Sequence, residues 1–298
     1  MADTLWLDEP STNRISATMQ QLDLSTIAKW RYMSNRSSNN RKAKSGRRNA
    51  PGDNSNLIYG LHAVQAALDA PSSRVLDVWL ADARDDQRVR AIAESAHRLG
   101  LKTHTVDREQ LDELLPDKIH QGCIARCKPL EALGEIELGM LLDDLEQPPL
   151  LLILDGVQDP HNLGACLRTA EAAGAHAVIA PKDRASGLTA TAVKISSGSA
   201  ERVPFFQVTN LARVLRDLQQ RGTWIIGTSG ESEESLYQSK LTGAVAIVLG
   251  AEGKGIRRLT REHCDEVVFI PMQGLTESLN VSVAAGVCLY EAYRQRHL

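Results

Sequence analysis

The chain has 298 residues, of which 43% are hydrophobic, and it carries a formal net charge of −3. This length suggests about two domains, and the apolar content is sufficient for a sizeable core in each. The five scattered cysteines form neither a disulfide framework nor a zinc spacing, and no apolar run approaches the ~18–20 residues that cross a bilayer. We therefore expect a cytoplasmic protein with reduced thiols, without a metal and without a membrane partner.

Residues 1–55 are predicted to be a disordered basic tail. The stretch from Lys29 to Arg48 holds eight Lys and Arg residues and no acid. These eight charges leave the rest of the chain at −11, given the total of −3. Residues 34–56 contain almost no apolar side chain that could offset the entropy lost on ordering. A basic arm on an acidic body indicates a polyanionic partner.

Residues 56–129 are predicted to form a small α/β domain. The stretch LIYGLHAVQAALD (57–69) predicts a short strand and then a helix with Leu61, Val64 and Leu68 on one face. We expect further strands over 75–81, 101–107 and 122–127, and helices over 89–100 and 108–115. Residues 130–148 are interpreted as a helix-containing linker.

Residues 149–298 are predicted to form a second α/β domain around a parallel sheet. Strands are expected over 151–155, 177–180, 203–208, 223–228, 244–250 and 266–271. Helices are expected up to Gly174, over 189–198 and 211–222, and over 278–297. The strands are continuously apolar, which is typical of parallel strands buried on both faces. Ligands of such sheets bind beyond the carboxyl ends of the strands, so the loops that follow them are the candidate site.

The first of these loops continues into DPHNLGACLRTA (159–170). Asn162 is a favourable N-cap, and Arg168 shares a helix face with Gly164 and Ala165, which are small enough to let its guanidinium reach a ligand. Taken alone, this arginine is more typical of a surface ion pair, here with Glu171.

Two later loops carry unusual sequences as well. LGAEGKGI (249–256) places three glycines around Glu252, but it matches neither the Walker loop nor the dinucleotide fingerprint, and alone it fits a surface turn. IPMQGLTESLNVSVAAG (270–286) places Ser278 and Asn280 at the start of the last helix. Asparagine there predicts a cap or a ligand contact, and capping by Thr276 or Ser278 is the plainer alternative.

Together and in this order, the three segments resemble the motifs of the SpoU (TrmH-type) branch of the SPOUT RNA 2′-O-methyltransferases, over about 150 C-terminal residues. YGLHAVQAAL (59–68) and HQGCIA (120–125) resemble the small RNA-binding domain of the 23S rRNA guanosine and thiostrepton-resistance enzymes. The match from Ile58 onward is most similar to the 23S rRNA guanosine enzymes. The resemblance implies S-adenosylmethionine-dependent methylation of a guanosine 2′-hydroxyl in 23S rRNA or a ribosomal precursor.

The resemblance also implies a role for each matching position. A deep trefoil knot would form the S-adenosylmethionine pocket, with the cofactor against the backbone of Thr228, Gly250, Ile270, Met272 and Leu279. Ser278 and Asn280 would organise the pocket, Glu252 would hold the glycine loop, and Asn162 and Arg168 would face the ribose and phosphate. Such proteins are homodimers, with the terminal helix and the first motif helix near the interface.

Arg168 is often proposed as the general base of such enzymes. A guanidinium pKa above ~12 makes that role unfavourable near neutral pH. We therefore interpret Arg168 as a bidentate phosphate ligand that stabilises the developing alkoxide. Three alternatives remain: an adenosine or another RNA as substrate, a non-catalytic RNA-binding assembly factor, and an NAD-dependent oxidoreductase, which the missing glycine fingerprint disfavours.

Overall fold

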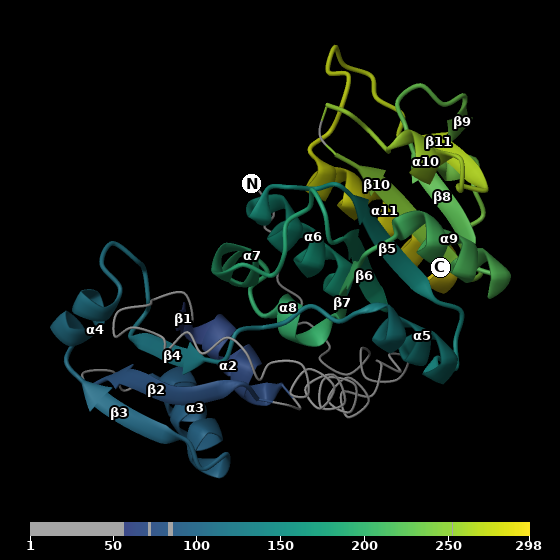
Figure 1. Ribbon diagram of the computed structural model, residues 1–298. Helices are drawn as coiled ribbons and strands as arrows, with labels where there is room; N and C mark the ends of the chain where they lie inside the picture. Colours follow the sequence, from purple (N-terminus) through teal and green to yellow (C-terminus); the bar gives the residue numbers. More distant parts are fainter. Residues whose placement is uncertain (1–56, 71–72, 83–85, 252) are drawn as a thin grey trace, which may run out of the picture.

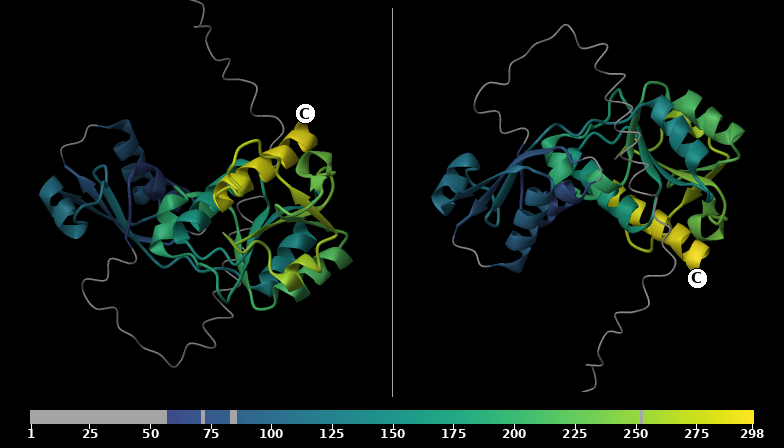
Figure 2. Two further views of the ribbon diagram at one scale, coloured as in Figure 1. Left: turned by 90° about the horizontal axis from the view of Figure 1, so that it is seen from above. Right: turned by 90° about the horizontal axis from the view of Figure 1, so that it is seen from below.

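The computed structural model describes residues 57–70, 73–82, 86–251 and 253–298. The predicted tail over 1–55 and Glu252 lie outside the described residues. Two lobes are visible, one built on a four-stranded sheet and one on a seven-stranded sheet (Figures 1 and 2). The α/β class and the two sheets agree with the sequence prediction. The domain boundaries and the trefoil knot stay predictions.

The smaller sheet has the order β1-β4-β2-β3. Its strands are β1 (Leu57–Tyr59), β2 (Val75–Ala81), β3 (Lys102–Val106) and β4 (Cys123–Cys127). Helices α2 (Leu61–Asp69) and α3 (Gln87–Arg98) bury apolar side chains against one face, and α4 (Arg108–Leu114) packs on the other. Strand β4 is antiparallel to β1 and β2, whereas β2 and β3 are parallel.

The larger sheet has the order β7-β6-β5-β10-β8-β11-β9, and all of its strand pairs are parallel. Its strands are β5 (Leu150–Asp155), β6 (Ala177–Pro181), β7 (Phe205–Val208), β8 (Trp224–Thr228), β9 (Glu234–Ser235), β10 (Val245–Gly250) and β11 (Glu266–Phe269). The accompanying helices are α5 (Glu135–Asp144), α6 (Pro160–Ala172), α7 (Ala190–Ile195), α8 (Ser199–Arg202), α9 (Leu211–Gln220), α10 (Arg258–Arg261) and α11 (Val281–His297). The short β9 and α10, and the 3₁₀ turn Leu236–Gln238, were not predicted.

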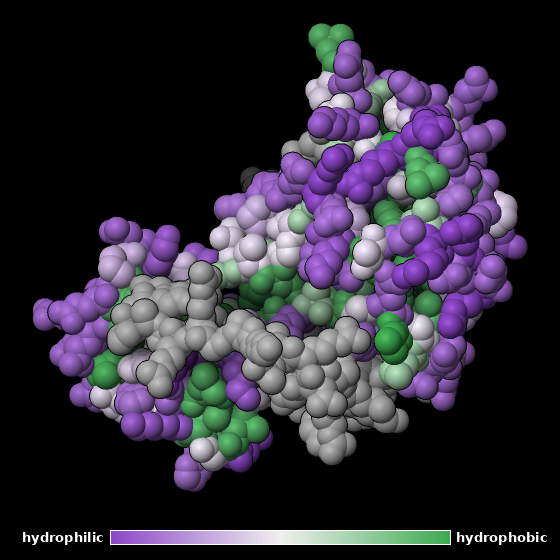
Figure 3. Space-filling model, viewed as in Figure 1, coloured by the Kyte–Doolittle hydropathy of each residue, from purple (hydrophilic) through white to green (hydrophobic). Residues whose placement is uncertain are grey.

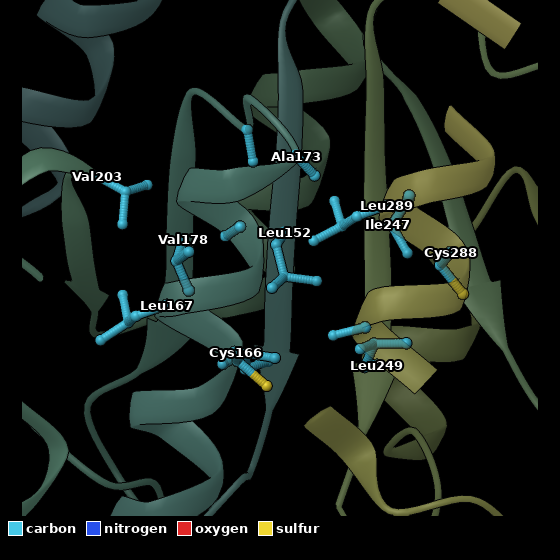
Figure 4. Packing of buried hydrophobic residues seen from close by; sticks show 14 of the residues in the cluster. Leu152, Cys166, Leu167, Ala173, Val178, Val203, Ile247, Leu249, Cys288 and Leu289 are labelled. Carbon is cyan, nitrogen blue, oxygen red and sulfur yellow. The ribbon is translucent and has the colours of Figure 1, made fainter. Parts of the chain in front are cut away.

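Helices cover both faces of this sheet, because alternate residues of each strand point to opposite sides. Leu152 of β5 and Ile247 of β10 pack with α6 and α11 on one face. Figure 4 shows Cys166 of α6 and Leu289 of α11 directed toward these strands, and Leu167 of α6 on the side of Val178 and Val203. Residues of the same strands that point the other way pack with α5 and α9. The sheet is therefore the middle of three layers, and its strand ends remain available for a ligand.

The helix predicted over 189–198 is confirmed as α7, but its predicted end is wrong by three residues. Helix α7 ends at Ile195, because Ser197 (φ 52°) and Gly198 (φ 94°) adopt left-handed backbone conformations that an α-helix cannot contain. Helix α8 begins immediately after them. The break has a packing reason: a Cβ on Gly198 would lie 2.4 Å from the Cβ of Ala66 in α2, so this glycine lets the smaller lobe contact the larger one.

The five cysteines are free thiols, four of them buried and Cys264 half-buried, as the sequence predicted. Burial raises the pKa of Cys123, Cys127, Cys264 and Cys288 to about 12, so these groups stay neutral and are poor nucleophiles. Within the described ranges, no cluster of His, Cys, Asp and Glu side chains could hold a metal ion. No described helix combines the length and apolarity needed to span a membrane.

Candidate functional site

The loops after β5, β8, β10 and β11 meet at the carboxyl edge of the parallel sheet, where the sequence placed the candidate site. They border two adjoining clefts. The first, which we call the glycine-loop cleft, has a volume of about 710 Å³. All five predicted cofactor contacts line it, and so does one predicted catalytic residue: Thr228, Gly250, Ile270, Met272, Leu279 and Ser278.

Gly250 lets the glycine loop fold directly over the end of β10. A Cβ there would lie 2.0 Å from the carbonyl carbon of Gly255 and 2.3 Å from its oxygen, so no other residue fits. The fold is closed by two backbone hydrogen bonds between Ala251 and Gly255, with N···O distances of 3.1 and 2.9 Å. Gly227 permits a similar approach, since its Cβ would lie 2.8 Å from Sγ of Cys264. Gly250, Gly253 and Gly255 therefore line the cleft with backbone alone, as the glycine spacing predicted.

The second cleft, which we call the basic cleft, has a volume of about 650 Å³ and shares Ala251, Lys254 and Gly255 with the first. Four cationic side chains line it: Arg184, Lys254, Arg257 and Arg258. The sequence reading missed these residues, although the run KGIRR directly after the glycine loop carries three of them. Such a concentration of cations favours binding of a phosphate-rich ligand.

Asp155 fixes the wall between the two clefts. It is fully buried at the end of β5, and its Oδ2 accepts a hydrogen bond from the backbone N–H of Arg257 at 2.9 Å. The Arg257 guanidinium lies 3.4 Å from Oδ1 of the same carboxylate. This pairing ties the loop after β10 to the end of β5 and neutralises a carboxylate that would otherwise be costly to bury.

Asn162 and Asn280 join the first motif to the third. The Nδ2 group of Asn280 donates a hydrogen bond to Oδ1 of Asn162 at 3.0 Å, across 118 positions of sequence. The prediction that Asn162 caps α6 is wrong, because Asp159 accepts the N–H of His161 and Pro160 takes the first helical position. The carboxamide of Asn162, which is buried, is therefore available to Asn280.

Asn280 is itself the N-cap of α11. Its Oδ1 accepts hydrogen bonds from the backbone N–H of Ser282 at 2.9 Å and from the Ser282 hydroxyl at 2.6 Å. The alternative that Thr276 or Ser278 caps this helix is therefore wrong, as is the start predicted at residue 278. One carboxamide thus starts the last helix with its oxygen and contacts α6 with its nitrogen.

Arg168 lies apart from these residues. Its side chain is exposed on α6 and lines a third cleft of about 390 Å³, together with His62 of α2 and Arg202 of α8. The alternative of a surface pair with Glu171 is wrong, because that carboxylate lies 3.5 Å from the Arg202 guanidinium and accepts the Ser199 hydroxyl at 3.3 Å. Within one chain, Arg168 therefore lines neither the glycine-loop cleft nor the basic cleft.

Two family models match the chain. Residues 149–290 match the SpoU rRNA Methylase family, and residues 57–133 match the RNA 2′-O ribose methyltransferase substrate binding family. The 23S rRNA (guanosine-2′-O-)-methyltransferase RlmB of Escherichia coli K12 is 54% identical over 242 residues, which cover 81% of this chain and 99% of that protein. The chain belongs to the SpoU rRNA methylase family.

Solved structures agree with this membership. An RNA 2′-O ribose methyltransferase crystal structure superposes with a TM-score of 0.66 at 26% identity, covering 92% of this chain and 96% of that one. The SpoU methyltransferase AviRb of Streptomyces viridochromogenes, solved in complex with AdoMet, gives a TM-score of 0.64 at 23% identity, with coverage of 80% and 89%. The second likeness concerns the fold alone. The combination of both family regions is thus shared with full-length SpoU relatives.

Proposed function

We propose that this SpoU family member transfers a methyl group from S-adenosylmethionine to the 2′-hydroxyl of a guanosine in 23S rRNA or a ribosomal precursor. The observation that carries the proposal is the junction of the glycine-loop cleft and the basic cleft, which share Lys254 and Gly255. A cofactor site and a phosphate-binding site that adjoin in this way suit a group transfer onto nucleic acid. The 54% identity to the E. coli relative supports the choice of RNA and nucleotide.

The glycine-loop cleft fits S-adenosylmethionine. Its volume of about 710 Å³ lies within the range of sites for ligands of that size. Backbone of Gly250 and Ile270 would hold the adenosyl part, and Leu279 and Ala284 supply apolar contacts. When bound, this cofactor supplies a methyl group activated by a positively charged sulfur. Ser278, which also lines the cleft, is placed to orient the cofactor.

On the RNA side, the basic cleft would hold phosphates next to the target ribose. Lys254 and Arg258 line both clefts, so they are placed to fix the nucleotide against the cofactor site. Asn162 and Asn280, held by their mutual hydrogen bond, would orient the ribose. Such positioning of reacting groups contributes up to roughly 7–11 kcal/mol to a barrier in favourable cases. We assign Arg168 to phosphate binding and alkoxide stabilisation rather than to proton abstraction.

The position of Arg168 in a separate cleft supports a homodimer, in which this residue serves the site of the other subunit. Helices α6 and α11 pack side by side (Figure 1), so a partner on α11 would also meet α6. The outer side of α11 exposes Val283, Tyr290 and Tyr293, with exposed fractions of 52%, 51% and 39%, respectively. A row of apolar and aromatic side chains of this kind is typical of a subunit interface.

A complementation assay tests the homodimer. Arg168→Ala and Gly250→Ala variants are unfolded together, refolded as a mixture and assayed at an S-adenosylmethionine concentration too low for the Gly250→Ala site to bind it. Half of the dimers then contain one copy of each variant. In each of these mixed dimers, one of the two sites combines the intact Gly250 of one subunit with the intact Arg168 of the other, so about a quarter of wild-type activity is expected. If the mixture is shown to contain mixed dimers and no activity is recovered, Arg168 serves the site of its own chain.

The proposed reaction is tested with the purified chain, S-adenosylmethionine and a 23S rRNA fragment, by digesting the product to nucleosides. We expect 2′-O-methylguanosine. If 2′-O-methyladenosine is found instead, the proposed 2′-O-methylation stands, but the substrate nucleotide is an adenosine. If neither product forms on the fragment or on a precursor, the result favours the non-catalytic alternative. Because the substrate is made and assembled with the ribosome, we place the protein in the cytoplasm.

A further inference from the structure

A fourth cleft lies between the two lobes and is not explained by the reaction. It has a volume of about 410 Å³ and is bordered by β1 and the loop after α4 on one side, and by α6 and α7 on the other. Figure 3 shows apolar surface in the hollow between the lobes. We call it the interlobe cleft.

The lining of the interlobe cleft combines an aromatic ring with cations. The Nζ of Lys194 lies 4.3 Å from the ring centroid of Tyr59 and donates a hydrogen bond to its hydroxyl. Leu57 and Leu115 extend the wall with apolar surface, and Lys118 adds a second ammonium group. An apolar and aromatic wall beside ammonium groups is the chemistry that binds an unpaired base together with its phosphate.

The charge of the cleft favours an anion. The carboxylate that lines it, Glu201, is 3% exposed and lies 2.8 Å from Nε of Arg74. Since that pair is internally compensated, Lys194 and Lys118 leave the cleft with a positive balance. Both lysine side chains are exposed, so a ligand phosphate could reach them.

The walls of the cleft are held in place. The Arg74–Glu201 pair joins the segment before β2 to α8, and Arg74 also donates a hydrogen bond to the carbonyl of Lys128 at 2.5 Å. Close packing of Ala66 on Gly198 makes a second contact between the lobes. The cleft is therefore pre-formed, as binding sites for small ligand groups usually are.

The interlobe cleft also adjoins the proposed reaction site. His161 lines it, and the next residue of α6, Asn162, lines the basic cleft. An RNA strand whose target nucleotide lies in the basic cleft would therefore place a nearby nucleotide at the interlobe cleft.

We propose that the interlobe cleft binds an unpaired nucleotide near the methylated one, with its base against Tyr59 and Leu57 and its phosphate on Lys194 and Lys118. The proposal rests on the proposed function, because it takes the ligand to be the substrate RNA. It gives the junction of the lobes a role in choosing the site of methylation, since both lobes must contact the same strand.

The first test uses the full chain and a 23S rRNA fragment, and measures the RNA dissociation constant as a function of salt. Loss of one phosphate contact in Lys194→Gln should reduce the magnitude of the slope of log K against log salt by about 0.7, the value for a single strand. It should also raise KM for RNA, with kcat and S-adenosylmethionine affinity unchanged. Lys240→Gln is the matched control, because Lys240 is exposed and lines none of the four clefts described here.

The second test uses RNA fragments in which each nucleotide beside the methylated one is made abasic in turn. Wild type should lose affinity roughly 10-fold at one position, and Tyr59→Ala should be insensitive to the change at that position alone. Equal losses in wild type and Tyr59→Ala at every position, with an unchanged salt slope in Lys194→Gln, would overturn the proposal. If wild type does not methylate the intact fragment or precursor at all, the proposed function fails instead.

Discussion

The two ends of helix α6 differ in what they contact. At the start of the helix, Asn162 is buried and accepts a hydrogen bond from Asn280 at 3.0 Å. Two turns later, Arg168 is exposed and lines a separate cleft beside α2 and α8. Near the start of the helix, Gly164 lies against α7, where a Cβ would be 2.6 Å from the carbonyl oxygen of Ala192, so α6 is closely packed there.

This difference shows that a motif contiguous in sequence need not form one site in space. The Asn162 end contacts the third motif of its own chain through Asn280, whereas the Arg168 side chain is exposed beside α2 and α8. Both ends can serve one reaction only if a second copy, or the RNA, brings them together. Changes at the two ends should therefore affect different measured quantities.

The largest effect is expected at the exposed end. Arg168→Lys retains the charge but loses the planar fork, so turnover should fall roughly 100- to 1000-fold, as when a preorganised donor is lost from a transition state. Affinity for S-adenosylmethionine, measured by calorimetry, should be unchanged, because Arg168 does not line the glycine-loop cleft. Arg216→Lys on α9 is the control, and near-normal turnover of Arg168→Lys would contradict the bidentate role.

Gly250→Ala should affect binding rather than turnover. The added Cβ meets the backbone of Gly255 at 2.0 Å, and a backbone so closely hydrogen-bonded cannot move aside cheaply. We expect roughly 10- to 100-fold weaker S-adenosylmethionine binding, from the 1–3 kcal/mol that overpacking typically costs. Gly243→Ala, where an added Cβ meets no atom within 4 Å, should bind normally. Equal behaviour of the two variants would show that the glycine loop is not the cofactor wall.

At the buried end, the Asn162–Asn280 hydrogen bond should be measurable by a double-mutant cycle. Asn280→Ala removes this bond and the cap of α11, whereas Asn162→Ala removes the bond and keeps the cap of α6, which Asp159 supplies. We expect a coupling of about 1 kcal/mol in the free energy of unfolding. Asn210→Ala, which removes the cap of α9, should show no coupling with Asn162→Ala. If the effects of Asn162→Ala and Asn280→Ala on the free energy of unfolding are additive, the first and third motifs are not energetically coupled, which would contradict this prediction.

The effect with the strongest dependence on salt is expected from the basic arm, which lies outside the described residues. Deletion of residues 1–50 removes nine Lys and Arg residues, eight of them between Lys29 and Arg48, and should weaken RNA binding by about 10-fold at low salt and little near physiological salt. The methylated position, mapped on the product, should be unchanged, because the arm supplies affinity without sequence information. A shifted position would give the arm a part in target selection.

The sequence predicted the parallel sheet and the close backbone approach at the glycine loop because both leave local signals, whereas the cofactor contacts are implied by the family resemblance and stay predictions. Apolar strands reveal burial on two faces, and the glycines around residue 252 reveal close backbone approach. We missed that Asp159 rather than Asn162 caps α6, although Pro160 at the first helical position is a local signal for a cap at Asp159. The break after Ile195 could not be predicted, because it depends on a contact with the other lobe, at Ala66.

The measurement that tests the account most directly is mapping of 2′-O-methylation on 23S rRNA from a strain that lacks this chain. We expect one guanosine to lose its methyl group, the wild-type chain to restore it, and Arg168→Lys to leave it largely unmethylated. An unchanged methylation pattern in the deletion strain, or full restoration by Arg168→Lys, would contradict the account.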